Sequence, residues 1–572
     1  MLKAPLLTVG IALALPGLPA LAQQTQVPDV DATLRQQLEL ERQRKLPAAK
    51  PPAPASSAPA SRAPAGPTIL VKRFTFEGNE RYTAAQLEPV VAGYLNRRVS
   101  LADLEVAAAD LARYYRAAGW VARVVVPPQK VDEGVVRFKV TEGVLGATRF
   151  STSTDTAALP VKPTVIVGNV QSRQAPGDKM NIPAVERGLL LADDLPGVAV
   201  AGSQVTGKKE GETDILLEVN HKGSYFGEVS LDNLGSRSTG QERAMLRLGA
   251  NSPLGLGDQF DALFQLTRYM QYLRLAGSVP LGADGLKLSA NASRLHYKVG
   301  TPEFAALEPR GNSSSLGADL LYPVIRTASR NLYLDLAVER KRPYNTATTG
   351  VVSDYDISNL LLKIDGNLFD SIGAGGITAL NLTQVFGRVN LNDSPAAYVA
   401  GDALTAQVAG RFRALRGRLT RTQRIDADWT LVAVLSGQHA NKNLDSAEKF
   451  YLGGPYGVRA YPANEAGGSK GLMFNADLRW RIPDTGQFGY ELSAFYDWGR
   501  ISNGYVTVPL PGRYSLRGYG MGLSLQAPHG VRLSAMVARR IGSNPGANLL
   551  NGHDQDGSLD KTRLWLILGM NF

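Results

Sequence analysis

Short runs of alternating apolar and polar side chains dominate the C-terminal part of the chain. In residues 562–572 the apolar positions Leu564, Leu566, Leu568, Met570 and Phe572 share one parity, whereas Arg563 and Asn571 fall on the other. The preceding run repeats this period of two between Val531 and Val537, which is typical of strands with one apolar face. Because Gly, Asn, Asp and Pro punctuate such runs from about residue 223 onward, the pattern predicts an all-β array.

The length of this array indicates how many strands it contains. The 349 residues from 224 to 572, at roughly 20 to 24 residues per strand with its connections, give about 15 to 17 strands. Since an even number is usual, we predict a 16-stranded transmembrane β-barrel over residues 223–572. Closure leaves no backbone group unpaired in the lipid. A soluble β-sandwich or propeller is the alternative.

Upstream, a mixed pattern of strands and helices occurs twice. In residues 68–146 a strand begins near Ile69, Thr83 and Ser100 open two helices with capping-box spacing, and two strands follow. The second helix carries an apolar stripe formed by Leu101, Leu104, Ala108, Leu111 and Tyr115. Residues 147–222 repeat the order, with a weaker first strand and a helix over 182–191. The sequence therefore predicts two small α+β domains.

These two domains carry the residue types of a binding module. Neither gathers an acid, a base and a nucleophile, which disfavours the alternative of an α+β enzyme domain. A sheet edge beside an apolar groove suits the binding of an extended chain. On the helix over 182–191 we predict that Glu186, Arg187 and Leu190 make such contacts.

The N-terminus has the pattern of an export signal. Lys3, an apolar stretch and the small residues at 20 and 22 predict a signal peptide over residues 1–22. The alternative, a buried N-terminal helix, is disfavoured by Pro16 and Pro19, which would break it. The mature protein is thus expected outside the cytoplasm.

A polar helix and a linker are predicted after the signal. Within residues 23–46, the segment 31–46 consists of strong helix formers with few leucines to bury, so packing alone would not hold this helix. Residues 47–67 contain seven Pro and eight Ala, a composition that favours an extended linker spanning on the order of 60 Å. The alternative is a leader without a role.

Composition excludes several kinds of site. The chain has 572 residues, 62 Lys+Arg against 51 Asp+Glu, and no cysteine, which rules out disulfides and thiolate sites. Past residue 22 there is no run of 18 apolar residues that would form a membrane-spanning helix. The five histidines are scattered, and the basic residues lack interleaved aromatics. We therefore predict no metal, no cofactor, no catalytic residue, no enzyme activity and no nucleic-acid partner.

Residues 450–462, FYLGGPYGVRAYP, resemble the VRGY-type tip of loop 6 in TpsB two-partner secretion transporters of the outer-membrane protein assembly superfamily. The paired residues at 119–120, 128–129 and 142–143 resemble the first POTRA domain of that family. The resemblance implies that residues 68–146 and 147–222 are POTRA domains. It also implies functional loop 6 residues within 453–462, namely Gly453, Gly454, Val458, Arg459 and Tyr461. Ala460 departs from the family, where glycine is commoner.

The parity of two strands suggests partners for Arg459. In residues 471–481 and 491–499 the alternation turns Asp477 and Asp497 toward the lumen, and both match acidic positions of the family. An arginine in a barrel lumen needs carboxylates to offset its desolvation, and its planar fork can hold two of them. The alternative for each aspartate is a solvated charge on the pore wall.

The resemblance also implies a function and a location. A TpsB transporter in the bacterial outer membrane, with POTRA domains in the periplasm and an N-terminal plug helix, would move a large TpsA-type exoprotein to the surface without ATP. The terminal Phe572 resembles the signature read by the barrel-assembly machinery, and membrane lipid would surround the barrel. The alternatives are a barrel-assembly insertase of the same superfamily and a passive porin or adhesin.

Overall fold

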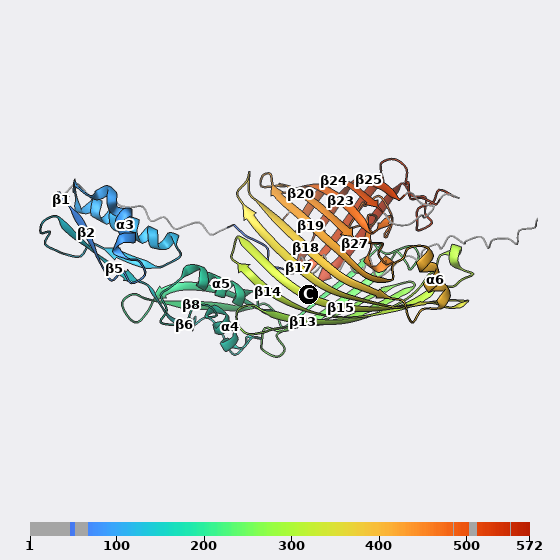
Figure 1. Ribbon diagram of the computed structural model, residues 1–572, viewed down its shortest axis with the longest axis horizontal. Helices are drawn as coiled ribbons and strands as arrows, with labels where there is room; N and C mark the ends of the chain where they lie inside the picture. The colour runs from blue at the N-terminus through green and yellow to red at the C-terminus, as the bar shows by residue number, and fades with distance from the viewer. Residues whose placement is uncertain (1–45, 52–66, 484–485, 503–511, 549–550) are drawn as a thin grey trace, which may run out of the picture.

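The computed structural model describes residues 46–51, 67–483, 486–502, 512–548 and 551–572. The predicted signal peptide lies outside the described residues, as do the predicted plug helix up to residue 45 and residues 52–66 of the linker. Figure 1 shows two α+β units in a row, blue and teal, followed by a β-barrel. Within the described ranges, no helix is long and apolar enough to cross a membrane.

The first unit packs two helices on a three-stranded sheet. The sheet has the order β2-β5-β4, with β2 parallel and β4 antiparallel to β5. Ser100 caps the second helix in the predicted capping box, and four residues of the predicted stripe are buried, whereas Leu101 is 59% exposed. The elements are β1 (Ile69–Val71), β2 (Arg73–Glu77), α2 (Ala84–Val91), η1 (Ala92–Tyr94), β3 (Arg97–Val99), α3 (Leu101–Ala117), β4 (Ala122–Val125) and β5 (Val135–Glu142).

The second unit repeats this topology. Its sheet has the order β6-β8-β7. As in the first unit, one outer strand, β6, is parallel to the central strand, and the other, β7, is antiparallel to it. The side chain of Asn181 caps α5, the helix predicted at 182–191. The elements are β6 (Val144–Phe150), α4 (Pro163–Val170), α5 (Ile182–Asp193), β7 (Val198–Thr206) and β8 (Glu212–His221). Since β6 begins at Val144, its first residues precede the boundary predicted at 146.

Apart from a small two-stranded sheet within one loop, the remaining strands form one closed antiparallel barrel. β16 and β17 both pair with β15 and are separated only by Tyr355, so they act as one strand, and the described residues form the predicted 16 strands. The strands are β9 (Tyr225–Asp232), β10 (Arg243–Asn251), β11 (Gln259–Thr267), β12 (Met270–Pro280), β13 (Lys287–Lys298), β14 (Arg310–Arg326), β15 (Arg330–Ala347), β16 (Gly350–Asp354), β17 (Asp356–Asp370), β18 (Gly376–Asn390), β19 (Gly410–Arg424), β20 (Trp429–Ala440), β23 (Lys470–Ile482), β24 (Gly489–Ser502), β25 (Arg513–Gln526), β26 (Val531–Arg540) and β27 (Thr562–Asn571).

Side-chain burial follows the predicted alternation. On β27, Leu564, Leu566 and Leu568 are exposed on the outside, whereas Arg563 and Trp565 are buried on the inside. The outer face offers apolar side chains to lipid, and the inner face offers polar ones to the lumen. The connection that contains α6 (Ala396–Leu404) lies at the end of the barrel away from the two units (Figure 1).

The barrel closes through a short pairing of its first and last strands. β27 and β9 pair only between Ile567–Asn571 and Glu228–Asp232. The side chain of Asn233 extends this ladder, because its amide donates to the carbonyl oxygen of Leu564 and its oxygen accepts from the N–H of Leu566. Beyond the other end, Gly227 and Phe572 exchange backbone hydrogen bonds of 2.8 and 3.0 Å.

Candidate functional site

Loop 6, residues 441–469 between β20 and β23, folds back into the barrel. It contains η3 (Ser446–Glu448), β21 (Phe450–Tyr451) and β22 (Gly467–Gly468). Buried side chains of the loop pack against buried side chains of β23 to β26; the loop residues are Leu452, Val458, Ala460, Tyr461 and Ala466, and the wall residues are Met473, Phe495, Leu516 and Ala538. The predicted motif therefore lies inside the lumen.

Glycines allow the tight turn at the tip of loop 6. A Cβ atom at Gly453 would lie 2.3 Å from a backbone oxygen of the same loop, and one at Gly457 would lie 2.0 Å from the carbonyl oxygen of Leu452. Gly454 has a φ of 107°, which favours glycine. The N–H of Val458 donates to the carbonyl oxygen of Leu452 at 2.6 Å and closes the turn.

The alanine that departs from the family motif fits because the wall opposite lacks a side chain. Ala460 is fully buried, and its φ is not positive, so its backbone does not require glycine. On β25, a Cβ atom at Gly518 would lie 2.6 Å from the Cβ of Ala460. Gly518 therefore provides the space that the extra methyl group occupies.

Arg459 binds both predicted aspartates. Its Nε and Nη2 donate to the two oxygens of Asp497 at 2.9 and 2.7 Å, and its Nη1 donates to Asp477 at 2.7 Å. Its backbone N–H also donates to Asp497 at 3.0 Å. The three side chains are at most 12% exposed. The planar guanidinium thus spans β23 and β24, as the parity of these strands predicted.

Further contacts fix the orientation of this arginine. The guanidinium lies over the ring of Phe495, 3.5 Å from its centre. The amide of Asn475 donates to Asp497 at 2.8 Å and to the carbonyl oxygen of Gly457 at 2.9 Å. From β27, the indole N–H of Trp565 donates to the carbonyl oxygen of Arg459 at 2.8 Å. The tip of loop 6 is therefore bound to three strands.

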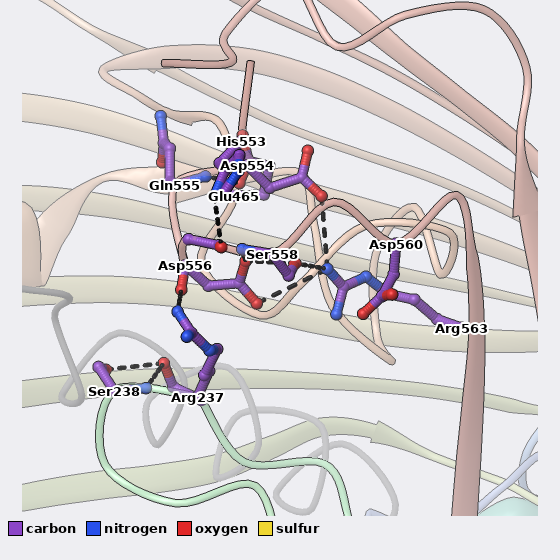
Figure 2. Close-up of polar contacts among 12 residues, drawn as sticks. Arg237, Ser238, Glu465, His553, Asp554, Gln555, Asp556, Ser558, Asp560 and Arg563 are labelled. Atoms are coloured by element: carbon purple, nitrogen blue, oxygen red, sulfur yellow. Dashed lines mark hydrogen bonds and ion pairs between the residues drawn. The ribbon is translucent and has the colours of Figure 1, made fainter. Parts of the chain in front are cut away.

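The end of loop 6 contacts loop 8, residues 541–561 between β26 and β27 (Figure 2). Glu465 is fully buried and accepts hydrogen bonds of 2.8 Å from the amide of Asn544 and from the N–H of Gln555. Asp554, beside them, is paired with Arg540 and Arg563 of the barrel wall. The carboxylate of Asp554 in loop 8 is thus compensated by two arginines, whereas Glu465 of loop 6 is bound by neutral donors of loop 8.

Tyr461, another predicted functional residue, belongs to the same region. Its fully buried ring lies below the guanidinium of Arg540, 4.7 Å from that group to the ring centre. Arg540 therefore contacts both the tip of loop 6 and Asp554 of loop 8. Sequence alone gave no sign of this connection, because loops lack the period that places strand side chains.

Two of the residues predicted to bind an extended chain hold the second unit on the barrel. Glu186 accepts a 3.1 Å hydrogen bond from the N–H of Ala328 in the turn between β14 and β15. Arg187 donates to Asp284 at 3.1 Å and to the carbonyl oxygen of Pro323 at 2.7 Å. The third residue, Leu190, is half-buried.

Asp284, in the turn between β12 and β13, is the acceptor at the centre of this contact. Burial raises the pKa of Asp284, but hydrogen bonds from Arg173, Tyr322 and Arg187 outweigh it and lower the pKa to about 2. The carboxylate is therefore charged at neutral pH. Arg326 of β14 adds a pair with Asp194 at 2.7 Å, so arginines bind across the contact in both directions.

The described part of the linker runs along the same mouth of the barrel. The carbonyl oxygen of Pro47 accepts from the amide of Asn367 at 2.9 Å, and the N–H of Lys50 donates to the carbonyl oxygen of Ala328 at 2.7 Å. Leu46 lines a lumenal cavity of about 850 Å³, whose walls carry both basic and acidic side chains. Leu46, at the start of this described segment, therefore lies at the lumenal cavity.

The ring of Phe572, the predicted assembly signal, lies against Gly227, where a Cβ atom would approach it to 2.2 Å. No group of three His, Cys, Asp or Glu side chains among the residues with assigned positions is arranged to hold a metal ion. The sequence analysis missed Glu448, Glu465, Trp565 and Gly518. Only Trp565 carried a signal, since the parity of β27 turns it inward.

Comparison with known proteins identifies related chains. The family described as "Haemolysin secretion/activation protein ShlB/FhaC/HecB" matches residues 211–525, and "POTRA domain, ShlB-type" matches residues 69–143. The heme/hemopexin transporter protein HuxB of Haemophilus influenzae (strain 86-028NP) is 26% identical over 82% of each chain. Solved structures of CdiB from Escherichia coli and Acinetobacter baumannii share the fold, with TM-scores of 0.77 and 0.67 at 18% and 15% identity; they cover 95% of this chain and 98% and 97% of their own.

Proposed function

Because the chain belongs to the haemolysin secretion/activation protein ShlB/FhaC/HecB family, we propose that it exports one large TpsA-type exoprotein in unfolded form. The protein is an outer-membrane transporter of two-partner secretion, with its POTRA region in the periplasm. The barrel mouth that holds the second unit is therefore the periplasmic one. Loop 6 starts from the opposite, external end.

The observation that carries the proposal is the position of loop 6, whose tip is bound inside the barrel. Arg459 is bound by two carboxylates inside a barrel that is wide enough to leave an 850 Å³ cavity. A passive pore has no need of a fully paired arginine held on a loop within its lumen. A transporter does, since the loop obstructs the path of a client and has to be held in a defined position.

The driving force comes from the client. The sequence contains no Walker-type glycine loop upstream of the barrel. An exoprotein that buries apolar surface when it folds outside gains the free energy that offsets the loss of chain entropy. Folding at the cell surface then makes each transported segment unable to slide back.

Secretion in a heterologous host tests the proposal. A Gram-negative strain without two-partner transporters is given this gene together with an exoprotein that has an N-terminal secretion domain and is encoded beside it. We expect the exoprotein in the medium only when the transporter is present. A host that secretes nothing, but whose other outer-membrane barrels increase in amount, would favour the insertase instead, and solute leakage without either effect would favour a porin.

A further inference from the structure

A carboxylate at the start of loop 6 lies in a second binding site that is distinct from the Arg459 site. Glu448 ends η3 and is fully buried. Lys341 of β15 binds its carboxylate at 3.0 Å, and Arg416 of β19 binds the other oxygen. The amide of Asn359 on β17 donates at 3.0 Å to the oxygen that Lys341 binds. One side chain of loop 6 is therefore bound by three strands of the barrel wall.

The backbone and the neighbours of Glu448 are fixed in the same place. Gln438 of β20 donates to the carbonyl oxygen of Glu448 at 3.0 Å. Asp445, in the same arm, accepts from the hydroxyl of Tyr355 at 3.1 Å. Leu444 and Ala447 are buried in an apolar cluster of the wall. The arm of residues 441–449 thus has an apolar contact and a charged contact with β15 to β20.

The two charged contacts of loop 6 use different parts of the wall. Arg459 binds β23 and β24, with Trp565 of β27, whereas Glu448 binds β15, β17 and β19. The strands that bind the guanidinium of Arg459 thus differ from those that bind the carboxylate of Glu448. Together the contacts extend from β15 round to β27, so the first arm and the tip of the loop are fixed to different parts of the wall.

We propose that Glu448 is a positioning residue of the transporter, a second anchor that holds the first arm of loop 6 independently of Arg459. This inference rests on the proposed function. Displacing the loop from the lumen requires that both anchors are broken, because each of them holds a different segment against a different wall. Loss of Glu448 alone frees residues 441–449 and leaves the tip in place.

The lack of cysteine in the chain makes a direct test possible. Ala447 and Ala463 are buried, at 2% and 8% exposure, in the arm and near the tip. Each is replaced singly by cysteine in the full-length protein, and the rate of labelling by a membrane-impermeant maleimide is measured on cells. The readout needs no client, so a protein that fails to secrete can still be tested for its anchors.

A reciprocal pattern is expected. Glu448→Gln leaves two cations without their carboxylate and should speed labelling at position 447 roughly tenfold, which corresponds to the loss of one charge-assisted hydrogen bond. Labelling at position 463 should not change. Arg459→Ala should have the opposite effect: labelling should become faster at position 463 and stay unchanged at position 447.

The matched control is Asp356→Asn, which removes an ion pair with Arg340 between β17 and β15 in which the arginine side chain is 64% exposed. It should leave both rates unchanged. If Glu448→Gln does not assemble, Lys341→Met breaks the same pair from the wall side and should give the same pattern. Equal labelling at both positions in every variant, or no change at 447, would overturn the proposal.

Discussion

At the scale of single residues, charge and shape both fix the tip of loop 6. Arg459 is neutralised by two carboxylates, and its peptide carbonyl is bound from a third strand. Ala460 fits only because Gly518 has no side chain. Charge contacts therefore fix the tip at Arg459, and packing fixes it at Ala460. Substitutions can alter the charge contacts without altering the packing, and the packing without altering the charge contacts.

Replacement of Arg459 by Ala or Lys, and of Asp497 by Asn, should abolish most secretion while the barrel still inserts. Breaking a buried pair costs on the order of 3 kcal/mol, which is enough to displace a loop but too little to open 16 paired strands. Lysine cannot hold two carboxylates in one plane. Secreted exoprotein and heat-modifiable gel mobility are measured together.

The control for this series lies on β23, the strand that carries Asp477. Arg479 of β23 pairs with Glu491 at 3.8 Å, and both side chains are 40% exposed. Since exposed pairs contribute about 0 to 1 kcal/mol, Arg479→Lys should secrete normally. Normal secretion in all three test variants would show that the Arg459 contact is dispensable.

Gly518→Ala should reduce secretion, and Ala460→Gly should restore it in the double variant. The added methyl would lie 2.6 Å from the Cβ of Ala460, and such overpacking costs about 1 to 3 kcal/mol. Gly366→Ala on β17, where a Cβ atom would be no closer than 3.4 Å to other atoms, is the control. Failure of the double variant to recover would mean that position 518 matters for a different reason.

At the scale of elements, α5 is both a helix of the second unit and the contact with the barrel. Glu186 and Arg187 bind turns of the barrel, while Leu191, which is 5% exposed, lies near Gly285 in the same turn as Asp284. Leu190 is only half-buried. A client that packs beside this helix would have to use its remaining surface, and that surface includes Leu190.

A photo-crosslinker at position 190 should therefore capture a stalled exoprotein, through the apolar contacts that accompany strand addition. The same crosslinker at position 191 should instead react with the turn between β12 and β13. The two positions are neighbours on one helix, so expression and insertion are matched. Capture of the client only by external loops would contradict periplasmic binding at this helix.

The attachment of the second unit should not depend on pH between about 5 and 8. Hydrogen bonds lower the pKa of Asp284 to about 2, so its stabilising contribution is complete above the ordinary aspartate value near 3.9 and is lost only as pH falls toward 2. Spin labels on cysteines at Lys209 and Ala427 measure the distance between unit and barrel. Asp284→Asn should broaden the distribution of this distance throughout this pH range. A change of the distance in the wild-type protein at pH 6 would contradict the idea that the charged Asp284 holds the second unit.

The elements could be predicted from the sequence where a period or a cap constrains them. The alternation along the strands predicts that Asp477 and Asp497 face inward, where both bind Arg459. The capping box at Ser100 predicts the start of α3. Glu448 and Glu465 could not be placed, because a loop has no period and its contacts come from distant strands. The docking role of Arg187 was missed for the same reason, since its partner Asp284 lies 97 residues away.

At the scale of the whole molecule, the linker, the second unit and the barrel meet at one periplasmic turn. The N–H of Ala328 donates to Glu186, and its carbonyl oxygen accepts from Lys50. One residue, Ala328, thus contacts both the second unit and the linker. Asn331 and Asn367 hold Pro47 beside this turn, so the linker enters the barrel at a fixed point rather than from an arbitrary direction.

This entry point supports the prediction that residues 31–46 occupy the lumen at rest and leave it during transport. Leu46 already lines the lumenal cavity, and a charged helix with few leucines suits a polar pore. Deleting residues 31–67 should raise single-channel conductance in planar bilayers and retain substantial secretion, because loop 6 keeps its own anchors on the wall. Deleting residues 24–30 removes chain ahead of the helix and should leave conductance unchanged. Equal conductance in both deletions would mean that the helix does not obstruct the pore, and that loop 6 alone accounts for its closure.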